Sequence, residues 1–101
     1  MTHFDNPEVD PRLDHATFML YLEEACGIDL AGMDESEVYA AGRRASQALV
    51  AAVLATDAAA DLKREAIDDG IRRRASCAAV ADLYIVSLIN SALATWRAGR
   101  R

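Results

Sequence analysis

Histidine is the side chain most often used for metal binding and for acid–base catalysis at neutral pH, and this sequence has two, His3 and His15. An intact start at "MTH" would let His3 complete a square-planar copper or nickel site. Methionine before a small residue is usually removed, however, and His3 then no longer stands at the position that such a site requires. His15 lies near Glu8, Asp10 and Asp14, but no cysteine or second histidine stands at ligand spacing. We therefore expect no metal site.

Catalytic patterns are also missing from the sequence. Glu23 and Glu24 are adjacent, so on a helix they point about 100° apart and cannot act as a carboxylate pair on one face. No serine or cysteine is placed to pair with His15, and the glycines stand singly rather than in a phosphate-binding loop. We predict that the protein is not an enzyme and uses no cofactor.

The two cysteines, Cys26 and Cys77, lie in apolar helical contexts. The first ten residues, "MTHFDNPEVD", are acidic and polar and do not resemble a signal peptide. Two cysteines without a dense framework are typical of buried thiols in a reducing compartment. We therefore expect free thiols and a cytoplasmic location.

A nine-residue pattern occurs twice, as "RRASQALVA" from Arg43 and as "RRASCAAVA" from Arg73, with seven of nine positions identical. Each Arg-Arg-Ala-Ser tetrad matches the preference of basophilic protein kinases, but each serine precedes an apolar helical run, where a phosphate would disrupt packing. Two copies are too few for a solenoid. We instead expect two helices that begin alike and pack together, with arginine at their solvent ends and alanine and serine at the contact.

The composition predicts an all-α fold. The chain of 101 residues is 52% hydrophobic and contains 21 alanines, with few β-branched and aromatic residues. We expect a small bundle of three or four helices with a hydrophobic C-terminal helix at its centre. The predicted organisation is a flexible acidic arm at 1–9, one helical domain at 10–98 and a basic tail at 99–101.

Local capping signals place the first two helices. Asp10-Pro11 predicts a start that leads to an end near Ala25, with Gly27 as a left-handed cap. Asp34 as N-cap and Glu37 three residues later form a capping box, so a second helix should begin near Glu35.

The middle of the chain allows one helix or two, because no glycine or proline occurs from Arg43 to Asp69. A cap at Thr56-Asp57 favours a break and a separate third helix. Gly70-Ile71 repeats the Gly27-Ile28 pattern and should close that helix, so the last helix is predicted from Arg72 to Trp96.

The segment from Cys77 to Trp96 is long enough to span a membrane, and its only charge is Asp82. Asp82, Ser87, Asn90 and Ser91 are costly in lipid, and alanine contributes little transfer energy. We therefore expect a buried core helix and no membrane partner.

Asp82 is the residue most strongly expected to be a buried polar group in the core. A buried charge requires a partner. Arg43 or Arg44 is the predicted one, at the start of the similar helix.

Charge is divided along the chain. Residues 1–37 hold ten acidic residues and one arginine, for a charge of −9, whereas residues 38–101 hold ten basic and six acidic residues, for +4. Such asymmetry indicates either internal complementarity or an acidic surface for a basic partner. We predict a non-enzymatic regulator or inhibitor, of the adaptor, immunity or phage and mobile-element inhibitor type, that binds a basic protein surface such as one that normally receives nucleic acid. The candidate partner-binding residues are Asp29, Asp34, Glu35, Glu37, Glu23 and Glu24.

Two other binding modes remain open. The apolar last helix and its alanine-rich faces favour a homodimer. The segment 63–79 has the spacing of a helix-turn-helix and predicts, as the alternative function, a DNA-binding transcriptional regulator. A pI of about 4.8 argues against nucleic acid as a partner. The nucleic-acid contacts in that alternative would be Arg72, Arg73, Arg74, Arg43 and Arg44.

Overall fold

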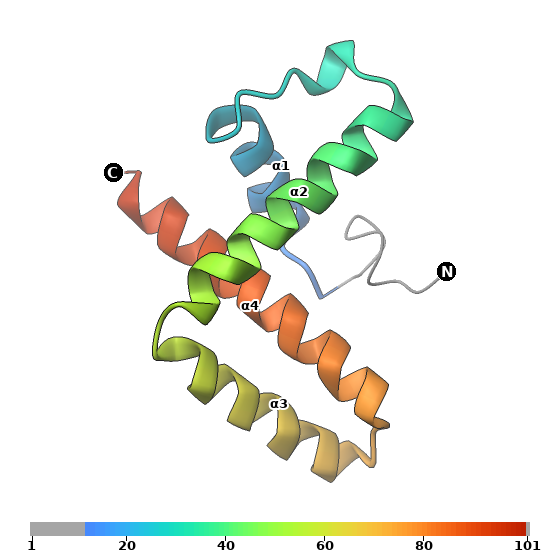
Figure 1. The fold of residues 1–101 in the computed structure, drawn as a ribbon, viewed down its shortest axis with the longest axis vertical. Coiled ribbons are helices and arrows are strands. Elements are labelled where there is room, and N and C mark those ends of the chain that lie inside the picture. Colours follow the sequence, from blue (N-terminus) through green and yellow to red (C-terminus); the bar gives the residue numbers. More distant parts are fainter. Residues whose placement is uncertain (1–11, 101) are drawn as a thin grey trace.

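The computed structural model describes residues 12–100, and in this range the chain is all-α, as predicted. It forms four α-helices and one short 3-10 turn, with no strand within the described residues (Figure 1). The arm predicted at 1–9 lies outside the described residues. The elements are α1 (His15–Glu24), η2 (Leu30–Gly32), α2 (Glu35–Leu54), α3 (Ala58–Arg73) and α4 (Cys77–Gly99).

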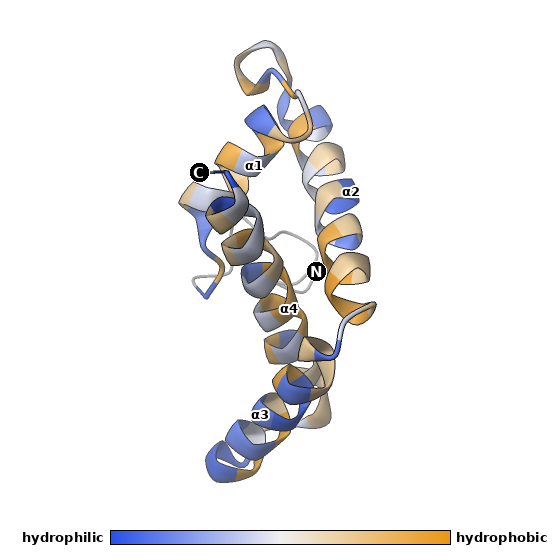
Figure 2. Ribbon diagram, turned by 90° about the vertical axis from the view of Figure 1, so that its left-hand side faces the viewer, coloured by the Kyte–Doolittle hydropathy of each residue, from blue (hydrophilic) through white to orange (hydrophobic). Residues whose placement is uncertain are grey.

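Helix α4 is the central element, and the other helices are arranged along it (Figure 1). Helix α2 crosses its middle, α1 lies beside its C-terminal half, and α3 runs beside its N-terminal half. The chain bends by 103° between α2 and α3. The described molecule is flat, with extents of 43 × 34 × 19 Å, and α3 extends away from the other helices at one end (Figure 2).

The hydrophobic core lies where α1, α2 and α4 meet. Phe18, Leu22, Leu88 and Leu93 are the largest side chains that are almost completely buried. Their burial gives each about 1.5–3 kcal/mol relative to exposure, so this three-helix contact is the main source of stability. The buried cluster comprises Leu13, Phe18, Leu22, Ala45, Leu49, Val53, Ala59, Leu88, Ile89, Ala92 and Leu93.

The predicted start of α2 and the predicted break after it are both confirmed. The side chain of Asp34 accepts a hydrogen bond from the backbone N–H of Glu37 at 2.8 Å, which satisfies one of the N–H groups left open at the helix start. Helix α2 ends at Leu54, and α3 begins after Asp57, although the Asp57 side chain makes no capping hydrogen bond. The hydroxyl of Thr56 instead donates to the carbonyl of Val53 at 2.7 Å and closes α2.

The predicted start of the first helix is wrong, because α1 begins at His15 with Asp14 as its N-cap. Asn90 of α4 holds the preceding residues out of the helix. Its Oδ1 accepts from the backbone N–H of Asp14 at 3.0 Å, and its Nδ2 donates to the carbonyl of Arg12 at 2.8 Å. Leu13 between them is buried in the core. A contact 76 residues away in sequence therefore sets where α1 starts.

The cap of α1 predicts a pH-dependent stability. Hydrogen bonds from the side chain and the backbone of Thr17 hold the pKa of Asp14 below its ordinary value of 3.8. A lowered pKa stabilises the fold above the unfolded-state pKa, and this contribution is lost as the pH falls through the folded-state pKa. We expect Asp14→Ala to cost about 1 kcal/mol at pH 7 and less near pH 3. Urea unfolding of both proteins at the two pH values measures this.

Asp14→Ser is the matched control, because serine also caps a helix but does not titrate in this range. The difference in free energy of unfolding between Asp14→Ser and Asp14→Ala should be the same at pH 7 and pH 3. If the cost of Asp14→Ala were equal at both pH values, the charged cap would contribute nothing.

The predicted end of α3 is also wrong, because the helix continues through Gly70 to Arg73. The left-handed residue is Arg74, with φ 54°, and the N–H of Ala75 donates to the carbonyl of Gly70 at 2.8 Å. Gly70 is buried in the helix because α4 passes close to it: a Cβ added there would lie 2.3 Å from Cγ2 of Val80. Gly27, in contrast, is left-handed as predicted, with φ 67°.

The repeated sequence adopts two different structures, so the prediction that the two helices begin alike is wrong, although α2 and α4 do pack together as predicted. The first Arg-Arg-Ala-Ser tetrad lies inside α2, where the Oγ of Ser46 is buried without a hydrogen-bond partner among the described residues. The second forms the turn between α3 and α4, where Ser76 is exposed and its Oγ accepts from the N–H of Ala79 at 3.1 Å. Helix α4 therefore begins at Cys77 rather than at Arg72.

Helix α4 is central but not buried along its whole length. Its buried residues lie between Val86 and Leu93, whereas the residues from Cys77 to Ala79 are exposed. By length and composition it is the one helix in the described part of the chain that could cross a membrane, with a mean hydropathy of 1.7. The bent pair α2 and α3 would add a second span only if taken as one broken segment, and core helices of soluble proteins meet the same criterion.

Candidate interaction surfaces

The structure brings the six predicted partner-binding carboxylates to one end of the molecule. They lie at the end of α1, in the connection through η2, and at the start of α2, which together form the upper end in Figure 1. All six residues are exposed. We call this group the acidic end: Glu23, Glu24, Asp29, Asp34, Glu35 and Glu37.

One carboxylate of the acidic end is engaged within the chain. Glu24 forms an ion pair with Arg100, whose guanidinium also lies over the ring of Trp96, 5.0 Å from its centroid. Trp96 in turn meets the ring of Tyr21 edge-on at 5.2 Å. Burial raises the pKa of Tyr21 above 10.0, so its hydroxyl stays neutral at physiological pH. The predicted basic tail thus begins inside α4, and Arg100 secures the end of α4 to α1.

The other five carboxylates have no ion-pair partner within residues 12–100. Asp34 and the two glutamates after it stand in the first turn of α2, where negative charge interacts favourably with the helix dipole. This local stabilisation explains how so many like charges are tolerated within a short segment. The acidic end is therefore a surface of excess negative charge.

The arginines proposed for nucleic-acid contact fall into two separate groups. Arg44 is ten residues before the end of α2, and Arg72 is fourteen residues after the start of α3. With a rise of about 1.5 Å per residue and a bend of 103° between the helices, the two groups lie roughly 20 Å apart. They do not form one continuous stripe.

Two arginines at the end of α3 are engaged by the same carboxylate. Nη2 of Arg72 lies 3.0 Å from Oδ1 of Asp69, and Nε of Arg73 lies 3.1 Å from Oδ2. Arg74 occupies the left-handed position of the turn. Arg72–Arg74 therefore close α3 instead of opening the would-be recognition helix, which corrects the geometry expected for a helix-turn-helix.

Asp82 is half-buried rather than buried, and the predicted pairing with Arg43 or Arg44 is wrong. Both arginines are exposed on α2, and no ion pair or hydrogen bond to Asp82 lies within residues 12–100. Helices α2 and α4 do pack together, but Arg43 and Arg44 lie on the exposed side of α2.

The cysteines are free, as expected, but they are exposed rather than buried. Cys26 follows the end of α1, and Cys77 is the first residue of α4, so neither faces the core. Among the described residues, no group of three or more His, Cys, Asp or Glu side chains could hold a metal ion. His3 lies outside the described residues.

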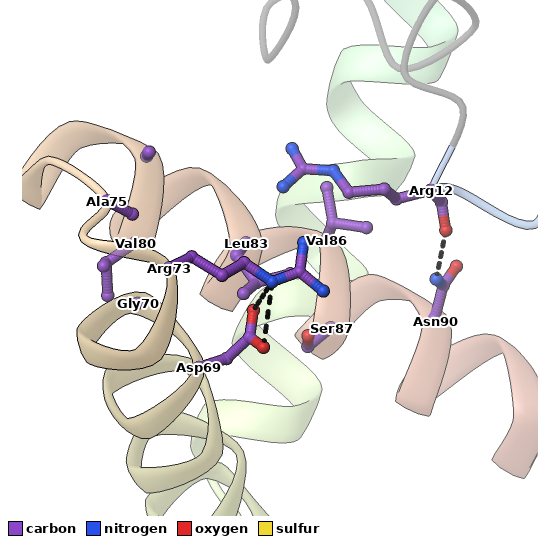
Figure 3. Close-up of a pocket in the computed structure, with 11 residues that line it drawn as sticks. Arg12, Asp69, Gly70, Arg73, Ala75, Val80, Leu83, Val86, Ser87 and Asn90 are labelled. Carbon is purple, nitrogen blue, oxygen red and sulfur yellow. Dashed lines mark hydrogen bonds and ion pairs between the residues drawn. The ribbon is translucent and has the colours of Figure 1, made fainter.

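A groove between α3 and α4, of about 420 Å³, was not predicted from the sequence (Figure 3). Val80, Leu83 and Val86 form an apolar wall, while Asp69 and Arg73 lie at its edge with their ion pair formed. Its lining comes from three separate segments, so no local sequence signal could have revealed it. Arg12, Ser87 and Asn90 also line the groove, so its surface is nearly as polar as it is apolar.

No protein-family model, curated protein or solved structure matches this chain. We therefore infer function from the geometry described above.

Proposed function

We propose that the protein acts by protein–protein contact through its acidic end, as a small non-enzymatic regulator or inhibitor of a basic partner. One observation carries the proposal: five exposed carboxylates lie together at one end of the fold without an ion-pair partner in the described residues. A surface of this kind attracts a positively charged partner and suppresses other contacts.

The partner that fits best is a protein with a basic groove that normally receives nucleic acid. Carboxylates held on a rigid helix start can match arginines and lysines that otherwise contact phosphates. The capped first turn of α2 holds Glu35 and Glu37 on a helix that packs in the core through Leu49 and Val53. The two carboxylates are thus held on a rigid helix, which lowers the entropic cost of binding.

The alternative, a DNA-binding regulator that uses segment 63–79, has weaker support. Residues 63–74 hold five basic and three acidic residues, so their net charge is only +2. Arg72 and Arg73 would first have to leave Asp69 to contact phosphate. Helix α4, which would enter the major groove, is apolar along most of its length.

A charge-reversal experiment tests the acidic end. We expect Glu23→Lys, Asp29→Lys and Glu35→Lys together to weaken partner capture from a lysate by roughly tenfold or more, because three attractive contacts become repulsive. Asp34 and Glu37 are left unchanged so that the cap of α2 is kept. Quantitative mass spectrometry of the captured proteins at about 0.05 and 0.3 M salt also tests the expected weakening by salt.

The control carries the same change of net charge on α3. Asp61, Glu65 and Asp68 are exposed there, and changing all three to lysine gives the same total charge at another location. We expect this variant to retain the partner. An unchanged partner list with the acidic-end variant, or equal loss with both variants, would contradict the proposal.

Titration with duplex DNA at low salt addresses the alternative. Absence of binding removes it. Two results together would favour DNA recognition over our proposal. DNA binding would have to disappear when Arg72, Arg73 and Arg74 are changed to alanine, and the acidic-end variant would have to capture its partner as well as the wild type does.

A further inference from the structure

The second Arg-Arg-Ala-Ser tetrad lies in an exposed turn, whereas the first lies inside a helix. All nine residues from 71 to 79 are exposed, and this run contains three arginines and Ser76. In the first copy Ala45 is buried and Ser46 is half-buried, with its Oγ shielded from solvent. An enzyme that must enclose a serine and the residues before it can therefore reach the second copy and not the first.

The backbone around Ser76 needs little rearrangement to become fully extended. Ser76 itself is already extended, with φ −68° and ψ 162°, and α3 ends three residues earlier at Arg73. Only the last turn of α3 has to open, where the N–H of Ala75 donates to the carbonyl of Gly70 at 2.8 Å. Such opening at a helix end requires much less free energy than opening in a packed interior.

Ser46 cannot be extended in the same way. It lies eleven residues after the start of α2 and eight before its end. Extension there would break the middle of the helix and pull Ala45 and Leu49, which are 5% and 4% exposed, away from their buried positions. The expectation from the sequence that a phosphate would disrupt packing therefore applies to Ser46 and not to Ser76.

The arginines before Ser76 are available to a binding enzyme. They precede the serine by two, three and four positions. The side chains of Arg72 and Arg73 are 75% and 76% exposed although both pair with Asp69, and exposed ion pairs of this kind contribute little to stability. Arg74 forms no ion pair within residues 12–100. Carboxylates of an arginine-selective enzyme can therefore bind all three.

We propose that Ser76 is a phosphorylation site for an arginine-directed serine kinase, and that Ser46, in the same tetrad, is not. The kinase supplies ATP as the phosphoryl donor. A bond forms between Oγ of Ser76 and the γ-phosphorus, while the bond from that phosphorus to the bridging oxygen breaks and ADP leaves with the electron pair. The hydroxyl proton passes to a carboxylate of the kinase.

Phosphate on Ser76 should strengthen the start of α4. The Oγ of Ser76 already accepts from the N–H of Ala79 at 3.1 Å, and other N–H groups of the first turn have no partner inside the helix. Phosphate oxygens can accept from these groups, and the helix dipole and the nearby arginines favour their negative charge.

The phosphate would also change the charge of the turn. Residues 72–76 carry +3, and a phosphate lowers this to about +1. The turn is at the lower end of the molecule in Figure 1, away from the acidic end. Phosphorylation would therefore alter the basic end of the fold and leave the acidic end unchanged.

Incubation of the folded chain with ATP and the catalytic subunit of cyclic-AMP-dependent protein kinase tests the site. We expect one phosphate per chain on Ser76, and a rate at Ser46 at least about 100-fold lower. Ser76→Ala should abolish incorporation, and Ser46→Ala should leave it unchanged. Peptides of residues 41–50 and 71–80 are the unfolded references, in which the two serines should react at similar rates. Mass spectrometry of proteolytic fragments locates the phosphate.

A matched pair of arginine variants tests recognition. Arg73→Gln with Arg74→Asn should lower the rate at Ser76 at least about tenfold, because two charged contacts with the kinase are lost. Asparagine tolerates the left-handed conformation of residue 74, so the turn is kept. Arg43→Gln with Arg44→Gln removes the same charge from α2 and should leave the rate at Ser76 unchanged.

Thermal unfolding tests the effect on α4. We expect phosphorylation to raise the Tm by about 2–6 °C, and this rise to shrink at high salt. Ser76→Ala treated with kinase and ATP should show no shift. A Tm that falls on phosphorylation would contradict the stabilisation of α4.

The site itself is overturned by any of three results. The folded chain could stay unmodified while the peptide of residues 71–80 is phosphorylated, Ser46 and Ser76 could react equally fast in the folded chain, or neither peptide could be a substrate. The acidic-end variant should be phosphorylated at the wild-type rate, so this proposal and the proposed function can fail separately.

Discussion

Gly70→Ala is expected to lower the free energy of unfolding by about 1–2 kcal/mol, although alanine is the better helix former by about 1 kcal/mol. The added Cβ would lie 2.3 Å from Cγ2 of Val80 and 3.6 Å from its Cβ. Valine on a helix has one strongly preferred rotamer, so Val80 cannot simply turn away. The helices must separate, and overpacking of this kind costs about 1–3 kcal/mol.

Gly42→Ala is the matched control, because Gly42 is also a buried glycine inside a helix. A Cβ there would lie 4.0 Å from the ring of Phe18, which is an ordinary contact. We expect this variant to be more stable by about 0.5–1 kcal/mol, so the same substitution should have opposite signs at the two positions. Thermal unfolding measures both changes, at about 4–8 °C per kcal/mol for a domain of this size.

Val80→Ala provides the rescue. In its background, Gly70→Ala should cost little or should stabilise, with a coupling energy of about 2 kcal/mol between the two positions. If Gly70→Ala were equally destabilising with and without Val80, the close approach of α3 and α4 would be contradicted.

Phe18→Ala is expected to have the largest effect of any single substitution considered, a loss of about 4 kcal/mol. Phe18 is 1% exposed and its ring lies between α1 and Gly42 of α2. Truncation removes the apolar contact and leaves a cavity that neighbouring α-helices cannot fill. Since small domains are stable by only about 5–15 kcal/mol, this single change removes a large share of the total.

Met19→Ala serves as the comparison for Phe18. Met19 follows it on α1 but is only half-buried against the core, so its truncation should cost clearly less. Urea unfolding followed by circular dichroism gives both values. Equal costs at the two positions would show that α1 does not dock through Phe18.

Two features of the molecule could be predicted from the sequence because their causes are local. The start of α2 at Asp34 depends on a hydrogen bond between residues three positions apart, and Gly27 adopts a left-handed conformation that other residues avoid. The acidic end could also be predicted, because its residues are close in sequence and follow one another through a short connection.

The start of α1 and the end of α3 could not be predicted, because tertiary contacts override the local signals. Asn90 of α4 holds the backbone at Arg12 and Asp14. Glycine is the residue type typical of a helix end, yet Gly70 lies inside α3, where it allows close packing against Val80. Arg74 takes the left-handed conformation that was expected at Gly70.

The repeated Arg-Arg-Ala-Ser tetrads show the same limit. Identical residues lie inside α2 in one copy and in a turn in the other, because helix capping and packing of the flanking segments decide their conformation.

The sequence by itself determined the all-α class, the break after α2 and the division of charge, since these follow from composition and short-range hydrogen bonds. Only the tertiary structure decided that Asp82 has no partner on α2 within the described residues, that the arginines form two groups, and that α4 leaves apolar surface uncovered. The physical reason is that these properties depend on how helices distant in the chain are oriented. That orientation is set by the fit of side chains such as Phe18 and Val80 at helix contacts, to which periodicity and charge counting are insensitive.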